Sequence, residues 1–174
     1  MMNEQELKDT IRSIPDYPIP GVLFRDITTL VKDPEAYNSL ITILSDELRP
    51  LNVDIVIGPE ARGFVFGAAV AYAINAGLVL ARKPGKLPCE VNRISYGLEY
   101  GTNSLEVHKD AIQPGMRVAI VDDLLATGGT ARAAVELVRE MGAEVVAAAF
   151  AIELTDLGGR EKLADCPVFT AIKY

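Results

Sequence analysis

The sequence predicts an α/β protein built on an open, mostly parallel sheet that helices cover on both faces. Two apolar runs, residues 55–57 (IVI) and 118–121 (VAIV), contain β-branched residues, as strands buried on both sheet faces do. Segments with helical spacing of apolar residues alternate with such runs. This alternation places the strands parallel, because each crossover helix returns the chain to the end of the sheet where the previous strand began.

In the N-terminal part, the pattern predicts two helices separated by a turn-rich segment. Leu7, Ile11 and Ile14 fall on one face of a short helix that the following proline ends. Residues 16–28 (DYPIPGVLFRDIT) combine prolines with a glycine, which favours turns. Residues 34–48 begin with proline and carry apolar residues at helical spacing, which predicts the second helix.

The rest of the chain continues the alternation, with one long interruption. Strands are expected at residues 55–57, 78–81, 118–121, 145–152 and 168–172, and helices at 63–75, 130–141 and 158–163. Residues 82–110 are polar and rich in glycine, proline and charge, with strand-like alternation at 105–108. A long excursion from the carboxyl end of a strand is usually a functional lid, so we expect a long flexible lid over these residues.

The composition fits a single domain over residues 1–174 and excludes one class of partner. Hydrophobic residues make up 49% of the 174 positions, which is ample for one core. The net charge of −7 argues against a nucleic-acid partner, because non-specific binding depends on Lys and Arg side chains that neutralise phosphates. A small phosphorylated ligand stays possible, because a local cluster of donors can hold it against the overall charge.

The sequence gives no sign of a secretory signal or a membrane span. Residues 1–15 are polar and lack the apolar centre of a signal peptide. Residues 64–81 are the only run long enough to suggest a span, but glycines and an asparagine interrupt it, which favours a helix end followed by a strand. Cys89 and Cys166 form no disulfide framework of a small secreted domain. We therefore expect free thiols, a cytoplasmic location and no membrane partner.

A glycine-rich loop after the strand at 118–121 is the clearest candidate for chemistry. In order, it contains Asp122, Asp123, Ala126, Thr127, Gly128, Gly129 and Thr130. Glycines allow close approach of the backbone to an anion, and N–H groups at a helix N-terminus donate to it along the helix dipole. The threonine hydroxyls add further donors. The segment therefore predicts a site for a phosphate group.

The two carboxylates of this loop indicate what the phosphate is attached to. Asp122 and Asp123 would repel the phosphate, whereas ribose hydroxyls are good partners for carboxylates, so the combination favours ribose 5-phosphate. The loop lacks the lysine of a nucleoside-triphosphate P-loop, and the chain has no G-x-G-x-x-G fingerprint. The alternative is a helix cap and a glycine turn without a ligand, which the order of strand, aspartates, glycines and helix disfavours.

The segment VAIVDDLLATGGT resembles the phosphoribosyl-diphosphate signature of the type I phosphoribosyltransferases, and its wording is similar to the adenine-specific members of that family. The resemblance extends from about residue 14 to residue 174. It includes PGVLFRDIT (20–28), GPEARGF (58–64), RKPGKLP (82–88), YGLEYGT (96–102) and VHKDAI (107–112). It implies transfer of the phosphoribosyl group of 5-phosphoribosyl 1-diphosphate to adenine, giving AMP and diphosphate in purine salvage, with Mg²⁺ held mainly through the substrate, in a homodimer.

A second ligand loop is expected where the strand at 55–57 ends. Glu60, Ala61 and Arg62 belong to GPEARGF, and the fork of an arginine suits the two oxygens of a diphosphate. Arg62 as a plain surface charge is disfavoured, because a cation at a helix start opposes the dipole. The resemblance implies that this is the diphosphate loop, with a cis peptide bond between Glu60 and Ala61, and that Arg62 takes part in catalysis.

Three cations lie at the start of the lid. Arg82, Lys83 and Lys86 form a basic cluster in an acidic chain, next to the two other anion-binding loops. A solvated basic loop is the alternative for any one of them. As a cluster they are expected to contact diphosphate, and the resemblance implies that this segment reaches the site of a neighbouring subunit.

Glu99 is the expected acid–base residue, with Tyr100 beside it in YGLEYGT. A carboxylate on a closing lid can exchange a proton with the imidazole ring of a purine as the glycosidic bond forms. The resemblance supports this role, because the proposed proton-transfer residue of the family matches Glu99. The alternative is an exposed loop glutamate without a catalytic role.

Recognition of the base is expected in PGVLFRD. The resemblance implies that Leu23, Phe24 and Arg25 form part of a short N-terminal hood (residues 15–30) over adenine. There the backbone accepts from the exocyclic amine and donates to the adjacent ring nitrogen, a pattern that an oxopurine inverts. The residue types alone do not decide between this role and a cap on the core.

Three other functions stay open at this point. The chain can act on another base, such as hypoxanthine, guanine or orotate. It can be a non-catalytic regulator that senses phosphoribosyl diphosphate, although few residues precede PGVLFRD to form a DNA-binding module. It can be a synthetase of the diphosphate, which requires a nucleotide site that the sequence does not display. Residues 89–94, at the lid tip, match no pattern of the family.

Overall fold

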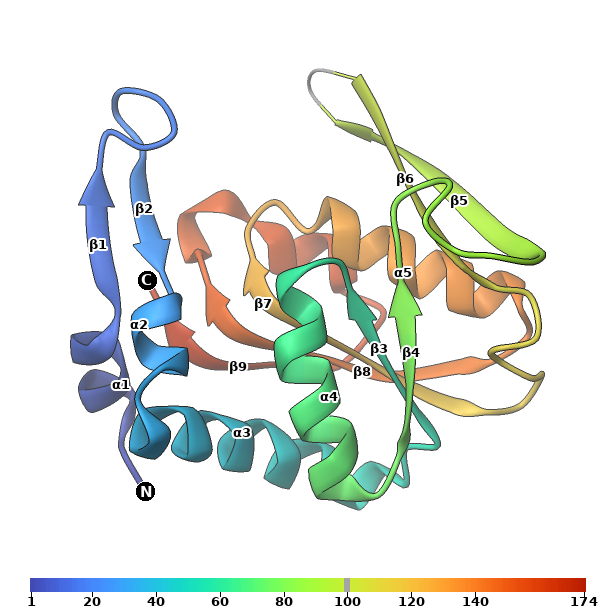
Figure 1. Cartoon of the computed structure of the whole chain (residues 1–174), viewed down its shortest axis with the longest axis horizontal. Coiled ribbons are helices and arrows are strands. Elements are labelled where there is room, and N and C mark those ends of the chain that lie inside the picture. The colour runs from blue at the N-terminus through green and yellow to red at the C-terminus, as the bar shows by residue number, and fades with distance from the viewer. Residues whose placement is uncertain (99–100) are drawn as a thin grey trace.

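The computed structural model describes residues 1–98 and 101–174, and a five-stranded parallel sheet forms its centre (Figure 1). The strand order is β4-β3-β7-β8-β9. The strands are β3 (Ile55–Pro59), β4 (Gly77–Ala81), β7 (Arg117–Leu125), β8 (Glu144–Glu153) and β9 (Val168–Lys173). Every pairing within this sheet is parallel, so the predicted fold class is confirmed.

Helices cover the sheet on both faces and enclose two separate cores. One face carries α1 (Glu4–Thr10), α2 (Thr28–Val31), α3 (Pro34–Leu48) and α4 (Arg62–Ile74), and the other carries α5 (Gly129–Glu140). Strand β7 serves both cores, because Ala119 faces the first and Ile120 the second. Short 3-10 helices complete the chain: η1 (Arg49–Leu51), η2 (Thr155–Leu157) and η3 (Gly159–Leu163). No described helix is long and apolar enough to cross a bilayer.

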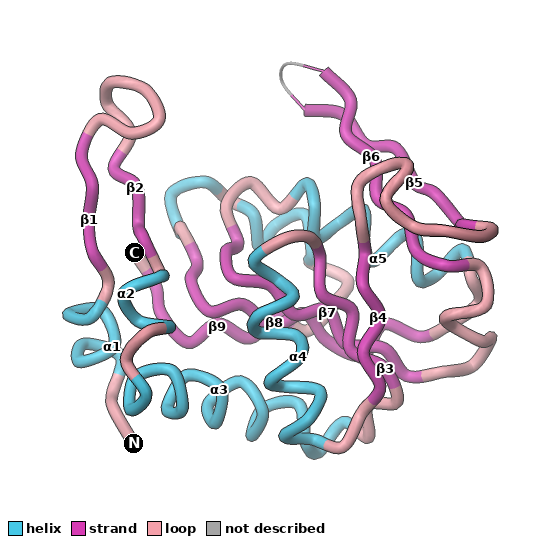
Figure 2. The backbone as a smooth tube through the Cα atoms, viewed as in Figure 1, coloured by secondary structure: helices cyan, strands magenta, loops and turns pink. Residues whose placement is uncertain are grey.

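Two antiparallel hairpins project beyond the carboxyl ends of the parallel strands (Figure 2). The first pairs β1 (Arg12–Pro15) with β2 (Leu23–Asp26), and it contains the expected hood. The second pairs β5 (Val91–Leu98) with β6 (Gly101–His108), and it lies within the expected lid. The lid is therefore mostly a regular two-stranded sheet, where the sequence predicted strand-like alternation only over 105–108.

The N-terminal helix is shorter than predicted. It ends at Thr10, and Ile14 lies in β1 opposite Phe24 rather than on the helix face with Leu7. A capping box between Asn3 and Glu6 fixes the start of the helix. Pairing with β2 then outweighs the helical spacing of the apolar residues, because tertiary contacts override a weak local preference.

Strand β7 is longer than predicted. Asp122 and Asp123 belong to the strand rather than to a loop, and the strand continues to Leu125. Its neighbour β8 supplies the reason, because the two strands stay paired through Asp122 opposite Phe150 and Leu125 opposite Glu153. This ladder holds the aspartates extended, although aspartate is disfavoured in strands when local preference alone acts.

The order of the strands fixes where a ligand can bind. From β3 the chain passes through α4 to β4 on one side, and from β7 it passes through α5 to β8 on the other side. Strands β3 and β7 are neighbours in the sheet. Their crossover connections therefore leave in opposite directions, and a crevice opens beyond their carboxyl ends.

Candidate functional site

A cleft with a volume of about 400 Å³ lies at the ends of β3 and β7. Residues 60–62 from the end of β3 and residues 122–131 from the end of β7 line it. The cleft thus brings together the seven residues expected to bind ribose 5-phosphate with Glu60, Ala61 and Arg62 from the expected diphosphate loop. These two groups are far apart in the sequence, and the parallel pairing of β3 with β7 makes them neighbours.

The loop between β7 and α5 presents backbone donors to the cleft. Gly128 is the N-cap of α5 with φ +77°, a conformation that favours glycine, and no side chain caps the helix there. The first N–H groups of a helix have no partner within it, so those of α5 are available at the cleft, with the positive end of the helix dipole. Thr127 is exposed beside them. This arrangement suits a dianionic phosphate.

The two aspartates have different electrostatic surroundings. Asp122 Oδ1 accepts a hydrogen bond from the Asp123 N–H at 2.8 Å. Burial, together with the negative charge of Asp123, raises the pKa of Asp122 well above its ordinary value. The Asp123 carboxylate is buried and forms an ion pair with the half-exposed Arg62 guanidinium. Arg62 therefore balances the charge of one carboxylate and faces the same cleft.

Helix α4 begins directly against Asp122 because Gly63 has no side chain. A Cβ atom at Gly63 would stand 2.8 Å from Asp122 Oδ1 and 2.9 Å from Pro59 Cδ. Glycine thus allows the first turn of α4, which carries Arg62, to approach the end of β7. This contact sets the position from which Arg62 reaches Asp123.

Glu60 connects the end of β3 to the base of the lid. Its carboxylate accepts from the Lys83 N–H at 2.9 Å and from Arg82 Nε at 3.0 Å. The Lys83 N–H and the Arg82 guanidinium lower the pKa of Glu60 below its ordinary value. The bond between Glu60 and Ala61 is a cis peptide bond. Glu60 therefore holds the lid base in this structure, in addition to lining the cleft.

The lid cations lie outside the cleft lining. Arg82 is half-buried, and its guanidinium carbon lies 6.0 Å from the centre of the Phe64 ring. Lys83 and Lys86 are exposed. Because Arg82 is bonded to Glu60, the structure places one of the three predicted cations beside the cleft wall and leaves the two lysines in solvent. Glu99 and Tyr100 lie outside the described residues.

The residues expected to recognise the base lie on β2, away from the cleft lining. Leu23 is 48% exposed. The Phe24 ring meets the Tyr17 ring edge-on at 5.2 Å between centres. Arg25 lies 3.9 Å from the centre of the Tyr174 ring and donates to Ser13 Oγ at 2.6 Å. The structure thus groups these residues on the first hairpin.

Several residues beside the cleft or within the lid were not predicted from the sequence. The Tyr96 hydroxyl, on the lid hairpin, lies 3.2 Å from Thr130 Oγ1 and so connects the lid to the phosphate loop. Glu106 is buried on β6, where it pairs with Arg93 and accepts from the Gly85 N–H at 3.0 Å. Gly159 contacts the phosphate loop through its backbone. Its only signal in the sequence was the Gly158–Gly159 pair.

The raised pKa of Asp122 predicts that its charge destabilises the fold at neutral pH. Above its ordinary value near 3.8, the unfolded state gives up the proton more readily than the folded state, so stability falls as pH rises through the folded pKa. Asp122→Asn should therefore raise the melting temperature at pH 8, by roughly 2–4 °C for each kcal/mol gained in the free energy of unfolding. Differential scanning calorimetry at pH 8 and pH 5 measures this gain, which should shrink at the lower pH.

Asp156→Asn, at an exposed position on η2, is the matched control and should shift the melting temperature little at either pH. An Asp122→Asn protein that is less stable than the wild type at pH 8 would contradict the assignment of a destabilising charge.

Comparison with known proteins identifies the family. The sequence model of the phosphoribosyl transferase domain matches residues 27–171. The chain is 52% identical to an adenine phosphoribosyltransferase of Acidobacterium capsulatum over 173 residues, which cover 99% of this chain and 96% of the relative. The adenine phosphoribosyltransferase of Thermoanaerobacter pseudethanolicus has a similar crystal structure, with a TM-score of 0.95 and 49% identity, covering 99% of this chain and 100% of the other.

The enzyme of the same name from Saccharomyces cerevisiae, complexed with adenine and an imino-altritol bisphosphate, gives a TM-score of 0.92 at 41% identity and covers 97% of each chain. The matches in sequence and structure thus span the cleft, the phosphate loop and both hairpins. The chain belongs to the phosphoribosyltransferase family.

Proposed function

We propose that the chain transfers the phosphoribosyl group of 5-phosphoribosyl 1-diphosphate to adenine, giving AMP and diphosphate in purine salvage. The observation that carries this function is the single cleft in which the carboxylates of Asp122 and Asp123, the phosphate loop and Arg62 meet. The base is assigned from the relatives, which are adenine phosphoribosyltransferases over nearly the whole length of this chain.

The ribose 5-phosphate part of the substrate matches the end of β7. Backbone N–H groups of residues 126–130 and the threonine hydroxyls would hold the 5-phosphate. These groups donate hydrogen bonds and carry no negative charge, whereas the carboxylates in the cleft would repel a phosphate. Asp122 and Asp123 would accept from the ribose hydroxyls. A carboxylate beside the ribose would also stabilise the positive charge that develops on the ring as the bond to diphosphate breaks.

The diphosphate would lie toward the end of β3. Arg62 is the cation within the cleft lining, and Arg82, Lys83 and Lys86 stand at the adjacent lid base. Glu60 and Ala61 line the same space. Cations at the leaving group stabilise the negative charge that develops there in the transition state. Arg62 thereby serves both the leaving group and, through its ion pair, Asp123.

Mg²⁺ fits this donor set as a partner of the substrate. Asp122 and Asp123 offer carboxylate oxygens, the ligands that Mg²⁺ prefers, at the floor of the cleft. The described residues include no group of three or more His, Cys, Asp or Glu side chains arranged around one metal position. Substrate oxygens would mainly hold the ion, and the bound ion would neutralise charge on the diphosphate.

Adenine would lie beneath the hood. Leu23, Phe24 and Arg25 would bind it, with backbone groups of β2 reading the exocyclic amine and the adjacent ring nitrogen. Glu99, with Tyr100 beside it, would exchange the proton of the imidazole ring as the new bond to ribose forms. Closure of the lid hairpin would exclude water, whose attack on the activated ribose would waste the substrate.

The central experiment is an assay of the purified chain with competing bases. Adenine, 5-phosphoribosyl 1-diphosphate and Mg²⁺ should give AMP and diphosphate, whereas hypoxanthine, guanine and orotate should react at least about 100-fold more slowly, because each leaves polar groups of the base site unpaired. Chromatography of the nucleotide products measures this preference. A chelator should abolish the reaction and added Mg²⁺ should restore it. Preferred turnover of an oxopurine would overturn the assignment of the base.

A second prediction concerns Glu99. Glu99→Gln keeps the size of the side chain but removes its capacity to take up a proton, so single-turnover AMP formation should slow by about 10²–10⁴-fold. Glu47→Gln, on the exposed side of α3, is a control for a general loss of negative charge. If Glu99→Gln formed AMP at the wild-type rate with chemistry as the rate-limiting step, the proton-transfer role would be wrong.

A homodimer would cover an apolar surface formed by α4 and β4. Val65 and Tyr72 on α4 are 42% and 91% exposed, and Leu78 and Leu80 on the edge strand β4 are each 39% exposed. Leu78 adjoins α4, because a Cβ atom at Gly67 would lie 3.5 Å from Leu78 Cδ1. Exposed apolar side chains gathered in this way mark an association surface. It adjoins the lid base through Ala81 and Arg82, which fits a partner subunit that reaches the cleft.

The dimer predicts a specific dissociation. Tyr72→Asp and Leu80→Lys should each shift the wild-type species from twice the chain mass toward the chain mass of 18.8 kDa in sedimentation velocity runs at micromolar concentration. Tyr17→Asp, an exposed aromatic residue on the first hairpin, is the control and should leave the mass unchanged. A wild-type chain that sediments as a monomer at these concentrations would contradict the dimer.

A cytoplasmic location completes the proposal. Both cysteines are free thiols, Cys89 exposed and Cys166 buried. Exposed free thiols persist in reducing compartments, which supports this location.

A further inference from the structure

The backbone of Gly159 lies directly against the phosphate loop. A Cβ atom at Gly159 would stand 2.2 Å from the Ala126 carbonyl oxygen and 3.0 Å from the Gly128 nitrogen. In the opposite direction, a Cβ atom at Gly128 would stand 2.6 Å from the Gly159 carbonyl oxygen. The two backbones are therefore in van der Waals contact with no side chain between them.

The contact, and not the backbone conformation, requires glycine at position 159. The φ angle of Gly159 lies outside the left-handed region, so an alanine could adopt its conformation. Gly158 is the opposite case, with φ +63° and no atom closer than 3.7 Å to a Cβ atom there. Glycine is thus required at position 159 by a close backbone contact and favoured at position 158 by a positive φ.

Arg160 fixes Gly159 from the side of the sheet. Its guanidinium donates to both carboxylate oxygens of Glu153, at 2.9 and 2.6 Å, and to the Val168 carbonyl at 2.9 Å and Thr170 Oγ1 at 3.3 Å. Glu153 is 5% exposed and also accepts from the Thr170 hydroxyl at 2.9 Å. Strands β8 and β9 therefore hold the start of η3 through a bidentate carboxylate–guanidinium pair, in which the carboxylate is buried and the guanidinium is partly exposed.

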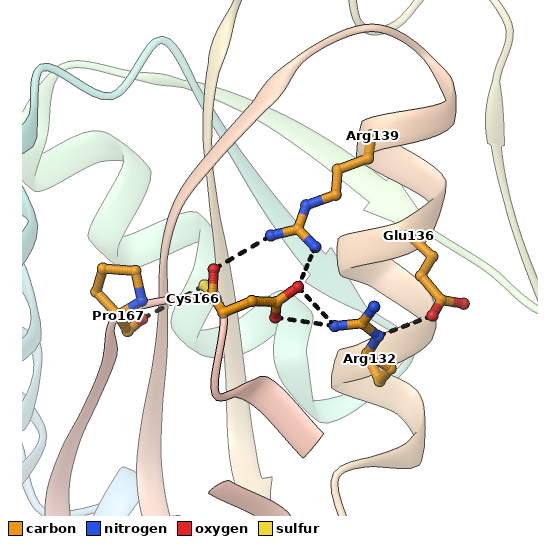
Figure 3. Close-up of polar contacts among 6 residues, drawn as sticks. Arg132, Glu136, Arg139, Cys166 and Pro167 are labelled. Atoms are coloured by element: carbon orange, nitrogen blue, oxygen red, sulfur yellow. Dashed lines mark hydrogen bonds and ion pairs between the residues drawn. The ribbon is translucent and has the colours of Figure 1, made fainter. Parts of the chain in front are cut away.

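A second attachment joins the far end of η3 to α5, the helix that the phosphate loop opens. Figure 3 shows Arg132 and Arg139 extending from α5 toward the chain that precedes Pro167. Arg132 Nη1 lies 2.9 and 3.0 Å from the two carboxylate oxygens of Asp165, and Arg139 Nη1 lies 2.5 Å from one of them. Segment 159–165 is thus fixed at both ends, with its first residue pressed on the loop.

We propose that Gly159 and Arg160 are positioning residues for the phosphate loop, which hold residues 126–128 in the shape that binds the 5-phosphate of ribose. This inference rests on the proposed function for the identity of the ligand. No side chain caps the helix at Gly128, and the backbone of Gly159 packs directly on Ala126 and Gly128. Backbone donors that are fixed before the ligand arrives bind it more tightly than donors that must be ordered.

The test compares Gly159→Ala with Gly158→Ala, using ribose 5-phosphate as the probe in isothermal titration calorimetry. Gly159→Ala should weaken binding at least about tenfold, because the new methyl group displaces Ala126 and Gly128. Gly158→Ala introduces strain at a positive φ but touches no loop atom, so its affinity should stay within about twofold of wild type even if its melting temperature falls.

Steady-state kinetics separates positioning from general loosening of the fold. Gly159→Ala should raise the KM for 5-phosphoribosyl 1-diphosphate by the same factor as the Kd, with the KM for adenine within about twofold of wild type. Arg160→Lys is a second variant, for use also where Gly159→Ala does not fold. The ammonium carries its donors on one nitrogen and cannot reproduce four hydrogen bonds that come from three nitrogens of the guanidinium, so Arg160→Lys should weaken ribose 5-phosphate binding about threefold or more.

Unchanged affinity for ribose 5-phosphate in folded Gly159→Ala and in Arg160→Lys would overturn the inference. Equal losses for Gly159→Ala and Gly158→Ala would overturn it as well, because local strain would then explain both. The binding measurement requires no turnover. If the wild type binds ribose 5-phosphate and Gly159→Ala does not, while adenine gives no AMP, the proposed function fails and the positioning role stands.

Discussion

The constraint on which the rest of the structure depends is the divergence of two neighbouring parallel strands. β3 and β7 lie side by side, but their connections leave toward opposite edges of the sheet, so the groups at their carboxyl ends have no helix over them. The unsatisfied N–H groups at the start of α5 and the cation at the start of α4 then face one crevice. Gly63, which lets α4 approach Asp122, and Gly159, which packs on the phosphate loop, each support groups that face this crevice.

The negative charge of each aspartate in the crevice is offset locally, and not by the net charge of the chain. Asp123 is compensated by Arg62, whereas burial and its neighbour favour the neutral form of Asp122. The acidic chain thus offers an anion site without a lysine in the loop, because backbone dipoles supply the donors. This explains how a net charge of −7 is compatible with a substrate that carries several negative charges.

Several groups of the site reduce the stability of the folded state. A buried carboxylate with a raised pKa and a helix start that carries a cation against its dipole both oppose the fold locally. The two apolar cores, which meet at the sheet through residues such as Ala119 and Ile120, supply the stability that tolerates this strain. The carboxylates, Arg62 and the backbone N–H groups at the start of α5 are thereby held in place in the cleft.

The sequence predicted the parts of the fold that depend on local spacing. Helix 34–48 has the predicted bounds, because a proline at its start and the Asp33 cap fix its beginning within the chain itself. Ile14 and the end of β7 were predicted wrongly, because pairing with β2 and β8 decides them.

The candidate site divides in the same way. Residues 122–130 of the cleft lining are contiguous, so a single motif predicted that they lie together. The contact between Gly159 and Gly128 was not predictable, because it depends on the pairing of Leu125 with Glu153 between two strands. The choice of base was predicted by resemblance, since neither residue spacing nor charge around Leu23 and Phe24 specifies a purine.

The contact of Gly159 with the loop also bears on the order in which contacts can form during synthesis of the chain. The loop and the helix that it opens are synthesised before β9, which carries Val168 and Thr170, the partners of Arg160. A nascent chain that has completed β7 and α5 therefore holds the loop residues without the surface that fixes them. The hydrogen bonds that join Arg160 to the sheet are therefore complete only after β9 has paired with β8.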